Sequence, residues 1–582
     1  MNLTAVKAWI VARKFAILAS LLFSLIFSSV FEGLRFYPPT DHGPGVYTGF
    51  TSYDSATYYA NAAEIFDRGN GLLYGNPYDL SPHPPQIYFH LFTIVQAHVW
   101  HWLGAGPSIQ EPLWRFVLGF IFLLLLDEAV GAFLKLPAGN RFRIYAHLVL
   151  ICGGGLVSWW TLPSAFHTWF YMAPEFEGHV SFMDVWQHHM HRLEDDAIFG
   201  RWLLSPARVF LMTQELYYHA LLYAGLLTFW KRRWWWCVAI MAIMWMSHPF
   251  TAVIGAALIG GGIALELCCD REFRRSFPIG VGAAMAAVQI LGLSYYQLFL
   301  PSYEVHREVV ANFSLPVSLQ ISTAPWSYVL FASGIFLPGA VIFLLSNRGR
   351  ASLFSDPSVR FLIFWFMAIV LLTEHDKFVS HPVQPLHFAR GYLLPPVALL
   401  ALRGLLEIRK RWPGRPPRDY RLVIYVLALL TVPDTFFFFV AYPSRAEYVW
   451  NAGAWLPHGD AEVIEYLKTQ PPAIILTIEE KPTSGLGYEI PTWTRHRTIL
   501  AHGCNTPWLA ERLKFCVDFL AAPSGKMLGE KNIDIVVVDA PALPEIDATG
   551  ALTKSLAAFE KRHENEHWQV WVRREKNSRD GL

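Results

Sequence analysis

A carboxylate near the start of a short amphipathic segment is the first residue of this sequence that could do chemistry. The segment runs from Thr51 to Ala60, and Asp54 lies close to its beginning. The positive end of a helix dipole favours a carboxylate in the first turn of a helix. There, Asp54 can take a proton from a hydroxyl group or bind a divalent metal ion. A helix-capping aspartate with no catalytic task is the alternative.

Two further acidic residues lie in a turn-rich stretch that also contains several histidines. Glu175 and Glu177 stand two residues apart in this stretch, ahead of the histidines at 188, 189 and 191. The spacing of these histidines does not match the usual ligand patterns of zinc sites. We therefore interpret the histidines as solvated interfacial residues, and the two glutamates are the acidic candidates of this stretch.

Basic residues in two other loops are candidates for binding a phosphate group. Arg390 stands just where an apolar stretch begins, with His387 three residues before it. A guanidinium can form paired hydrogen bonds with phosphate oxygens. Arg307 is a weaker candidate of the same kind. An arginine that only anchors the chain at lipid headgroups is the alternative.

The composition indicates that much of this chain faces something other than water. Of its 582 residues, 53% are hydrophobic and 16% are charged, with 23 Trp and 42 Phe. Soluble proteins have about 25% charged residues. The net charge of +1 favours no nucleic-acid partner. A small soluble enzyme, a collagenous chain and a disordered chain are excluded, and a polytopic membrane protein is indicated.

Apolar runs divide most of the chain into segments that are candidates for crossing a bilayer. A helix needs about 20 mainly apolar residues to cross the hydrocarbon layer of a membrane. About eleven apolar runs are candidates for such membrane-spanning helices. They lie at 15–30, 113–134, 144–163, 207–230, 234–247, 250–268, 278–299, 326–346, 358–373, 388–406 and 422–442.

The basic loops predict the orientation of these segments. Lys and Arg collect after every even-numbered span and before the first one, and such loops are cytoplasmic. The N-terminus is then cytoplasmic, and the long loops and the tail lie outside, in the periplasm or the extracellular space. Ile87 to Leu103 is interpreted as an amphipathic helix on the outer surface. The protein would lie in the cell (inner) membrane.

The tail from about 443 to 582 lacks the long apolar runs, and its predicted helices and strands alternate as in an α/β domain. Helices are predicted at 460–468 and from Pro507, which follows a capping Thr, to about 520. Strands are predicted at 473–478, 533–538 and 568–572. Cys504 and Cys516 are the two cysteines of this exported part, and we predict that they form a disulfide.

The first external loop resembles that of the GT-C superfamily of integral membrane glycosyltransferases. Four pieces of sequence carry the resemblance: Thr51–Ala60, Phe66–Gly71, Asn76–Tyr78 and Pro82–Pro85. The resemblance implies an all-α membrane protein with surface-lying helices in the first external loop. It also implies an exported C-terminal α/β domain. The predicted domains are a catalytic membrane domain at 1–442 and a soluble exported domain at 443–582.

The resemblance also implies roles for the candidate residues. Asp54 matches the catalytic acidic position, and Glu175 or Glu177 matches the second acidic site of the superfamily. Arg390, with His387 and Arg307, would bind the phosphate of a lipid carrier. The donor would be a sugar on a polyprenyl phosphate, and the acceptor a glycan, lipid or protein. A divalent metal ion (Mg or Mn), held by Asp54, is an expectation for some members only.

Two other functions compete with a glycosyltransferase. A transporter or lipid flippase typically has paired broken helices in two matching halves, and the sequence has no such repeat. A non-catalytic assembly protein on a GT-C scaffold would keep the architecture without the chemistry, and the sequence does not distinguish it from an enzyme.

Overall fold

The computed structural model describes residues 3–36, 45–67, 69, 71–172, 181–182, 185–186, 189, 206–313, 333–380, 384–411, 418–444, 453–480, 483 and 485–574. The chain divides into two compact units. The helical unit contains Met1–Phe31, Leu113–Leu293 and Ser314–Arg445. The mixed unit contains Glu32–Pro112, Ser294–Phe313 and Ala446–Leu582. One boundary, at 445/446, lies close to the predicted 442/443, but two earlier segments also belong with the C-terminal part.

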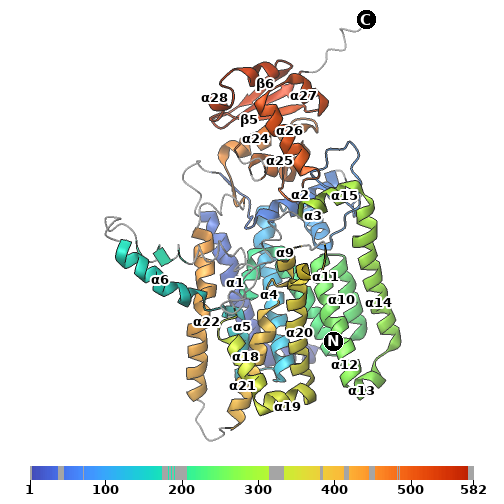
Figure 1. Ribbon diagram of the computed structural model, residues 1–582, viewed down its shortest axis with the longest axis vertical. Helices are drawn as coiled ribbons and strands as arrows, with labels where there is room; N and C mark the ends of the chain where they lie inside the picture. The colour runs from blue at the N-terminus through green and yellow to red at the C-terminus, as the bar shows by residue number, and fades with distance from the viewer. Residues whose placement is uncertain are drawn as a thin grey trace. The chain divides into compact units, whose positions relative to one another are not determined.

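The helical unit is built from the apolar runs of the sequence, which form helices because a helix satisfies its own backbone hydrogen bonds. Figure 1 shows several of these helices running side by side. The helices of this unit are α1 (Leu3–Glu32), α4 (Pro107–Leu134), α5 (Arg141–Cys152), α6 (Val157–Met172), α9 (Thr213–Trp230), α10 (Trp234–Trp245), α11 (Pro249–Gly255), α12 (Gly261–Cys269), α13 (Arg271–Ser276), α14 (Ile279–Ser294), α18 (Phe336–Leu345), α19 (Asn347–Ser355), α20 (Pro357–Thr373), α21 (Leu394–Arg411) and α22 (Arg418–Ser444).

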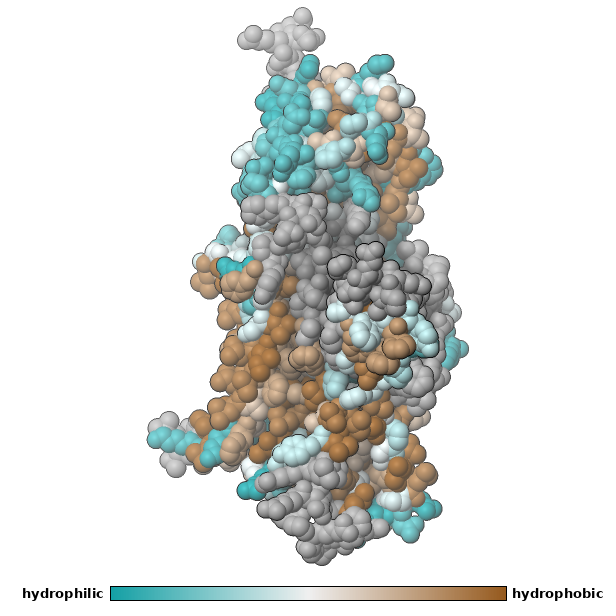
Figure 2. Space-filling view, turned by 90° about the vertical axis from the view of Figure 1, so that its left-hand side faces the viewer, coloured by the Kyte–Doolittle hydropathy of each residue, from teal (hydrophilic) through white to brown (hydrophobic). Residues whose placement is uncertain are grey.

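Four helical stretches in the described part of the chain are long and apolar enough to cross a membrane: Lys7–Phe36, Pro107–Leu134, Pro249–Cys269 and Ile279–Ser302. Helices α19 and α20 qualify together as a fifth, bent by 93°. Figure 2 shows apolar side chains gathered on one outer face of the helical unit. Exposed apolar residues of α1 and α22 include Phe15, Leu18, Leu22, Tyr425 and Leu429. An apolar outer surface of this kind is expected where helices face lipid.

The predicted span 144–163 is not one continuous helix. Helix α5 ends at Cys152, and α6 begins at Val157 and leaves the direction of the other helices (Figure 1). Three glycines, 153–155, occupy the break. A Cβ atom on Gly154 would come within 2.7 Å of the Asp434 side chain of α22, and the Gly154 N–H donates to the Thr431 carbonyl at 2.9 Å. The glycines therefore let the chain approach α22 closely, and the same residues interrupt the helix.

The mixed unit combines the first long loop with an α/β sheet. The loop contributes β1 (Val46–Tyr47), α2 (Tyr53–Asp67) and α3 (Leu91–Leu103), and a later segment contributes α15 (Glu304–Phe313). Helix α3 confirms the predicted amphipathic helix within Ile87–Leu103. It begins where His90 accepts a hydrogen bond from the Thr93 N–H (3.1 Å), and Gly104 ends it in the left-handed conformation.

The C-terminal sheet has the strand order β4-β3-β5-β7-β6, in which β4, β3 and β5 are parallel. Two buried clusters cover its two faces, one against α26 and the other against α24 and α25. Figure 1 shows these helices around the sheet. Strand β2 (Trp455–Leu456) pairs with β1 in a separate two-stranded sheet. The other elements of this C-terminal part are α24 (His458–Lys468), β3 (Ile474–Ile478), α25 (Leu486–Trp493), β4 (Arg497–Thr498), α26 (Leu509–Ala521), α27 (Gly525–Glu530), β5 (Ile535–Asp539), α28 (Leu543–Ile546), α29 (Ala551–Ser555), β6 (Phe559–Glu564) and β7 (Trp568–Arg573).

Two details predicted for this domain are wrong. Helix α26 begins at Leu509 rather than Pro507, because the Thr506 hydroxyl donates to the carbonyl of His502 instead of capping the helix. Cys504 and Cys516 are both free thiols. Cys504 lies in the loop before α26, while Cys516 packs in the hydrophobic core under that helix.

Three carboxyl groups, one buried and two partly buried, give the C-terminal domain a predicted dependence of stability on pH. Burial raises the pKa of Asp460 to about 6, of Glu479 to about 7 and of Glu489 to about 8. The folded state therefore holds protons that the unfolded chain releases above pH ~4.5. The free energy of unfolding should fall as the pH rises from ~4.5 to 8 and level off above that.

We expect Glu489→Gln to flatten this dependence, since the glutamine carries no charge and its oxygen can still accept from Trp493 Nε1. The variant should be more stable than the parent at pH 9, by an amount on the order of a few kcal/mol. Thermal unfolding of the purified protein between pH 5 and 9 measures this difference. Glu545→Gln, at an exposed position of α28, is the matched control. A parent protein equally stable across this range would contradict the prediction.

Candidate functional site

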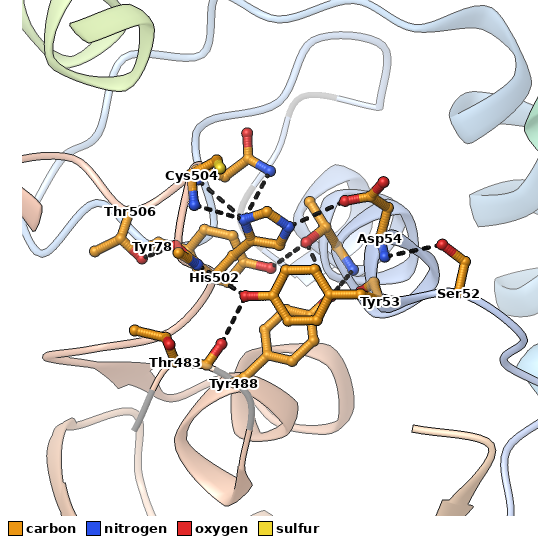
Figure 3. Close-up of polar contacts among 12 residues, drawn as sticks. Ser52, Tyr53, Asp54, Tyr78, Thr483, Tyr488, His502, Cys504 and Thr506 are labelled. Atoms are coloured by element: carbon orange, nitrogen blue, oxygen red, sulfur yellow. Dashed lines mark hydrogen bonds and ion pairs between the residues drawn. The ribbon is translucent and has the colours of Figure 1, made fainter. Parts of the chain in front are cut away.

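The candidate site lies at the carboxyl ends of two parallel strands. Strands β3 and β4 are parallel neighbours, and Glu479 directly follows β3. His502 comes four residues after the end of β4. In open α/β sheets, ligands bind at the edge formed by the carboxyl ends of the parallel strands. The start of α2 contacts the loops at this edge, as the hydrogen bonds below show, and it brings Asp54 there (Figure 3).

Asp54 occupies the first turn of α2, as the sequence predicts. Its backbone N–H donates to the Ser52 hydroxyl at 3.4 Å. The side chain is 43% exposed, so a substrate can reach it, and its Oδ1 atom lies 3.2 Å from Nε2 of His502. The predicted carboxylate is therefore accessible and hydrogen-bonded to a histidine from the C-terminal domain.

The surroundings of His502 determine which of its nitrogens carries the proton. Its Nδ1 atom accepts hydrogen bonds from the backbone N–H groups of Cys504 (2.9 Å) and Asn505 (3.1 Å). An imidazole nitrogen that accepts cannot carry a proton, so in the neutral ring the proton is on Nε2. The Nε2–H group then donates to Asp54 Oδ1. His502 is only 3% exposed, and this donor has a fixed direction.

Tyrosine hydroxyl groups hold α2 against the C-terminal domain. Tyr53 donates its hydroxyl hydrogen to the Thr483 carbonyl (2.6 Å), and its oxygen accepts from the Gly503 N–H (2.9 Å). Tyr488 donates to the carbonyl of Tyr53, and its oxygen accepts from the N–H of Thr57 at 3.3 Å. Burial raises the pKa of Tyr53 well above its ordinary value, so Tyr53 stays protonated and acts as a structural donor.

The loop that carries His502 is also held in one conformation. The Thr506 hydroxyl donates to the His502 carbonyl at 2.7 Å. Asn312 of α15 donates from Nδ2 to the carbonyls of Cys504 (3.2 Å) and Thr506 (2.7 Å). Burial raises the pKa of the Cys504 thiol to about 11, so this cysteine is protonated at neutral pH and is not a nucleophile.

The second acidic pair and the basic candidates occupy other places. Glu175 and Glu177 lie outside the described residues. Arg307 lies on α15 in the mixed unit and donates to the Pro301 carbonyl at 2.7 Å. His387 belongs to the helical unit, in the short helix Pro385–Phe388, and stacks on the ring of Phe250 at 4.5 Å.

Arg390 also belongs to the helical unit, where it is 7% exposed. Its guanidinium forms an ion pair with Glu215 of α9, and its carbonyl contacts Nε2 of His219 at 2.9 Å. Gly391 follows in the left-handed conformation, and a Cβ atom there would come within 2.7 Å of the His219 ring. A phosphate bound by Arg390 would therefore compete with a buried carboxylate.

The described residues do not by themselves fit a metal site. Within the described ranges, no group of three His, Cys, Asp or Glu side chains is placed to hold a metal ion. At Asp54, the neighbouring His502 uses one nitrogen as a donor to Asp54 and the other as an acceptor from the backbone. In this arrangement His502 offers no nitrogen lone pair to a metal ion beside Asp54.

His502 is the residue that sequence reasoning missed. It stands 448 positions from Asp54, in a domain for which the sequence predicts no catalytic residue. The short stretch His502–Thr506 has the small and polar residues of a turn, which is a weak local signal. Only the packing of α2 on the sheet edge brings the two side chains together.

No protein-family model and no curated protein matches the sequence. Solved structures similar to it include the oligosaccharyltransferase AglB from Archaeoglobus fulgidus, in complex with an inhibitory peptide and a dolichol-phosphate. That structure has 12% identity, a TM-score of 0.38, and coverage of 96% of this chain and 74% of that one. ArnT from Cupriavidus metallidurans has 13% identity, a TM-score of 0.46 and coverage of 98% of both chains.

Proposed function

We propose that the protein is a membrane glycosyltransferase that moves one sugar from a polyprenyl-phosphate carrier to an acceptor hydroxyl group. The observation that carries this proposal is the accessible carboxylate of Asp54, hydrogen-bonded to a buried histidine at the carboxyl ends of β3 and β4. A base held in this way, in a loop that is flanked by apolar helices in sequence, suits chemistry between a lipid-borne donor and a polar acceptor.

The reaction needs one proton acceptor and one leaving group. Asp54 takes the proton of the acceptor hydroxyl. At the same time, the oxygen of that hydroxyl forms a bond to the anomeric carbon of the sugar. The bond between that carbon and the phosphate oxygen breaks, and the electron pair leaves with the polyprenyl phosphate. His502 holds the carboxylate in place by donating from Nε2. The proposed ligands of the carrier phosphate are Arg390 and His387, with Arg307 as a weaker candidate. The proposed residue that assists the acceptor is Glu175 or Glu177.

Transfer from labelled lipid donors tests the proposal. Purified protein in phospholipid nanodiscs is incubated with a set of radiolabelled polyprenyl-phosphate sugars and with a membrane extract as the source of acceptor. Parallel samples contain Mg²⁺, Mn²⁺ or a chelator, which decides whether a divalent ion takes part. Transfer of label from the lipid to a new product is the expected result, and failure with every donor under all three conditions would contradict the proposal.

The proposed topology can be tested in intact cells. About eleven spans with a cytoplasmic N-terminus place the C-terminal domain outside the cell membrane, in the periplasm or extracellular space. Lys526 is well suited to labelling, since its side chain is 84% exposed. We expect Lys526→Cys to react with a membrane-impermeant maleimide in cells whose inner membrane is intact. Arg350→Cys, in a predicted cytoplasmic loop, should react only after permeabilisation, and the reverse pattern would overturn the orientation.

A further inference from the structure

A pocket of about 290 Å³ in the mixed unit is separate from the residues that surround Asp54. It lies between the loop after Tyr78, one face of α26 and the turn that follows α27. The volume suits a small molecule, at the lower end of the range for ligand sites. Its lining includes Asp79, Trp508, Glu511, Arg512 and Lys531.

Arg512 supplies a buried charged group at the wall of this pocket. It is only 6% exposed. Its Nη1 atom donates to the carbonyls of Tyr78 (2.8 Å) and Ile499 (3.3 Å). Among the residues that the structure describes, none accepts a hydrogen bond from its Nε or Nη2 atoms. Buried charged groups are normally satisfied by hydrogen bonds, so the remaining N–H groups are suited to a ligand in the pocket.

Trp508 supplies an aromatic surface beside this arginine. Its φ angle of 52° is in the left-handed region, where a bulky residue is an outlier of the kind found at functional sites. The indole packs partly against Ile87, Leu300 and Val305. The centre of its ring lies 5.9 Å from the Arg512 guanidinium carbon. The backbone is therefore held in an unfavourable conformation that places the indole at the pocket.

The charges around the pocket are mixed in sign. Lys531 forms an ion pair with Glu511 at 2.8 Å. Asp79 accepts hydrogen bonds from the N–H and the hydroxyl of Ser81 and adds a negative charge near Arg512. A strongly anionic ligand would meet these carboxylates, and a cationic one would meet Arg512 and Lys531. A neutral molecule with many hydroxyl groups can use both the donors and the acceptors.

We propose that this pocket binds an uncharged saccharide, with one sugar ring stacked on Trp508 and its hydroxyl groups bonded to Arg512 and Glu511. An aromatic face beside polar groups that both donate and accept matches a sugar ring, which has apolar C–H faces and a rim of hydroxyls. The pocket is distinct from Asp54, and binding there does not require the proposed transfer reaction. If transfer is confirmed, the pocket holds a sugar of the acceptor.

A glycan array tests this proposal with the full-length protein in phospholipid nanodiscs, since maltoside detergents would compete for the site. The array carries uncharged oligosaccharides and matched uronate-containing and sulfated ones. We expect binding to uncharged glycans, with an affinity for the best one that falls at least tenfold in Trp508→Gly and in Arg512→Lys. Glycine accepts the left-handed backbone, so the first change removes the indole without adding strain.

Lys514→Gln is the matched control, because Lys514 lies on the same helix with 72% of its side chain exposed and does not line the pocket. Should either pocket variant fail to fold by thermal unfolding, Glu511→Gln replaces it, since Glu511 is 63% exposed. Binding only to charged glycans, no binding at all, or equal affinity in the folded pocket variants would overturn the proposal. Asp54→Asn should keep full binding, which separates this result from that of the transfer assay.

Discussion

Asp54→Asn is expected to lower the rate of glycosyl transfer by about 10²–10⁴-fold, the contribution typical of a positioned general base. Asparagine has nearly the same size and can still accept the hydrogen bond from His502 Nε2 through its amide oxygen, but it cannot take a proton from the acceptor. Asparagine also serves well at helix starts. Folding and binding of the lipid donor should therefore remain close to those of the parent, and initial rates with a labelled donor measure the loss.

Asp67→Asn is the matched control for this experiment. Asp67 ends the same helix α2, is partly exposed, and has an ion pair with Arg495 at 3.5 Å. Its loss should leave the rate nearly unchanged. Equal losses in the two variants would mean that the charge of the loop matters rather than one carboxylate. A fully active Asp54→Asn protein would show that this residue is a helix cap only.

His502→Asn is expected to lower the transfer rate by about 10–100-fold, since a hydrogen bond to a charged group contributes about 1.5–3 kcal/mol. The asparagine oxygen can replace Nδ1 as the acceptor for the N–H groups of Cys504 and Asn505. It supplies no donor in the place of Nε2. The loop should therefore keep its conformation while Asp54 loses the contact that orients it, and the loss should appear in kcat.

His502→Gln tests the role of Nδ1 as a hydrogen-bond acceptor. Its amide nitrogen can reach the position of Nε2 and donate to Asp54, but the two backbone N–H groups lose their acceptor. We expect a smaller loss of rate and a larger fall in the melting temperature than for His502→Asn, because a buried donor without a partner costs about 1–3 kcal/mol.

A double variant decides whether His502 acts through Asp54. If it does, Asp54→Asn combined with His502→Asn should be about as slow as Asp54→Asn alone, since the two residues act as one unit. Multiplied losses would mean that His502 has an independent role. A pH profile of kcat that is unchanged in His502→Asn would also be inconsistent with a role in positioning the base.

Local patterns of the chain were sufficient to predict much of the architecture. Helices α4, α9 and α20 follow from apolar runs, and α3 follows from its amphipathic pattern. The elements α24, β3, β5 and β7 lie within two residues of the predicted bounds. The resemblance of the first loop and the place of Asp54 at the start of an amphipathic segment indicated this residue, and both depend only on neighbouring residues. These features share a local cause, since periodicity and capping act over a few residues.

The tertiary structure decided what depends on residues far apart in the chain. The break between α5 and α6 follows from contact with α22, and the separation of Cys504 from Cys516 follows from the path of the chain into α26. Arg390 meets Glu215 only because the turn before α21 packs against α9. His502 reaches Asp54 because parallel strands bring their carboxyl ends to one edge of a sheet, where α2 is held by Tyr53 and Tyr488. The spacing of residues in the sequence does not predict such contacts, since they depend on which helix and sheet surfaces pack against one another when the chain folds.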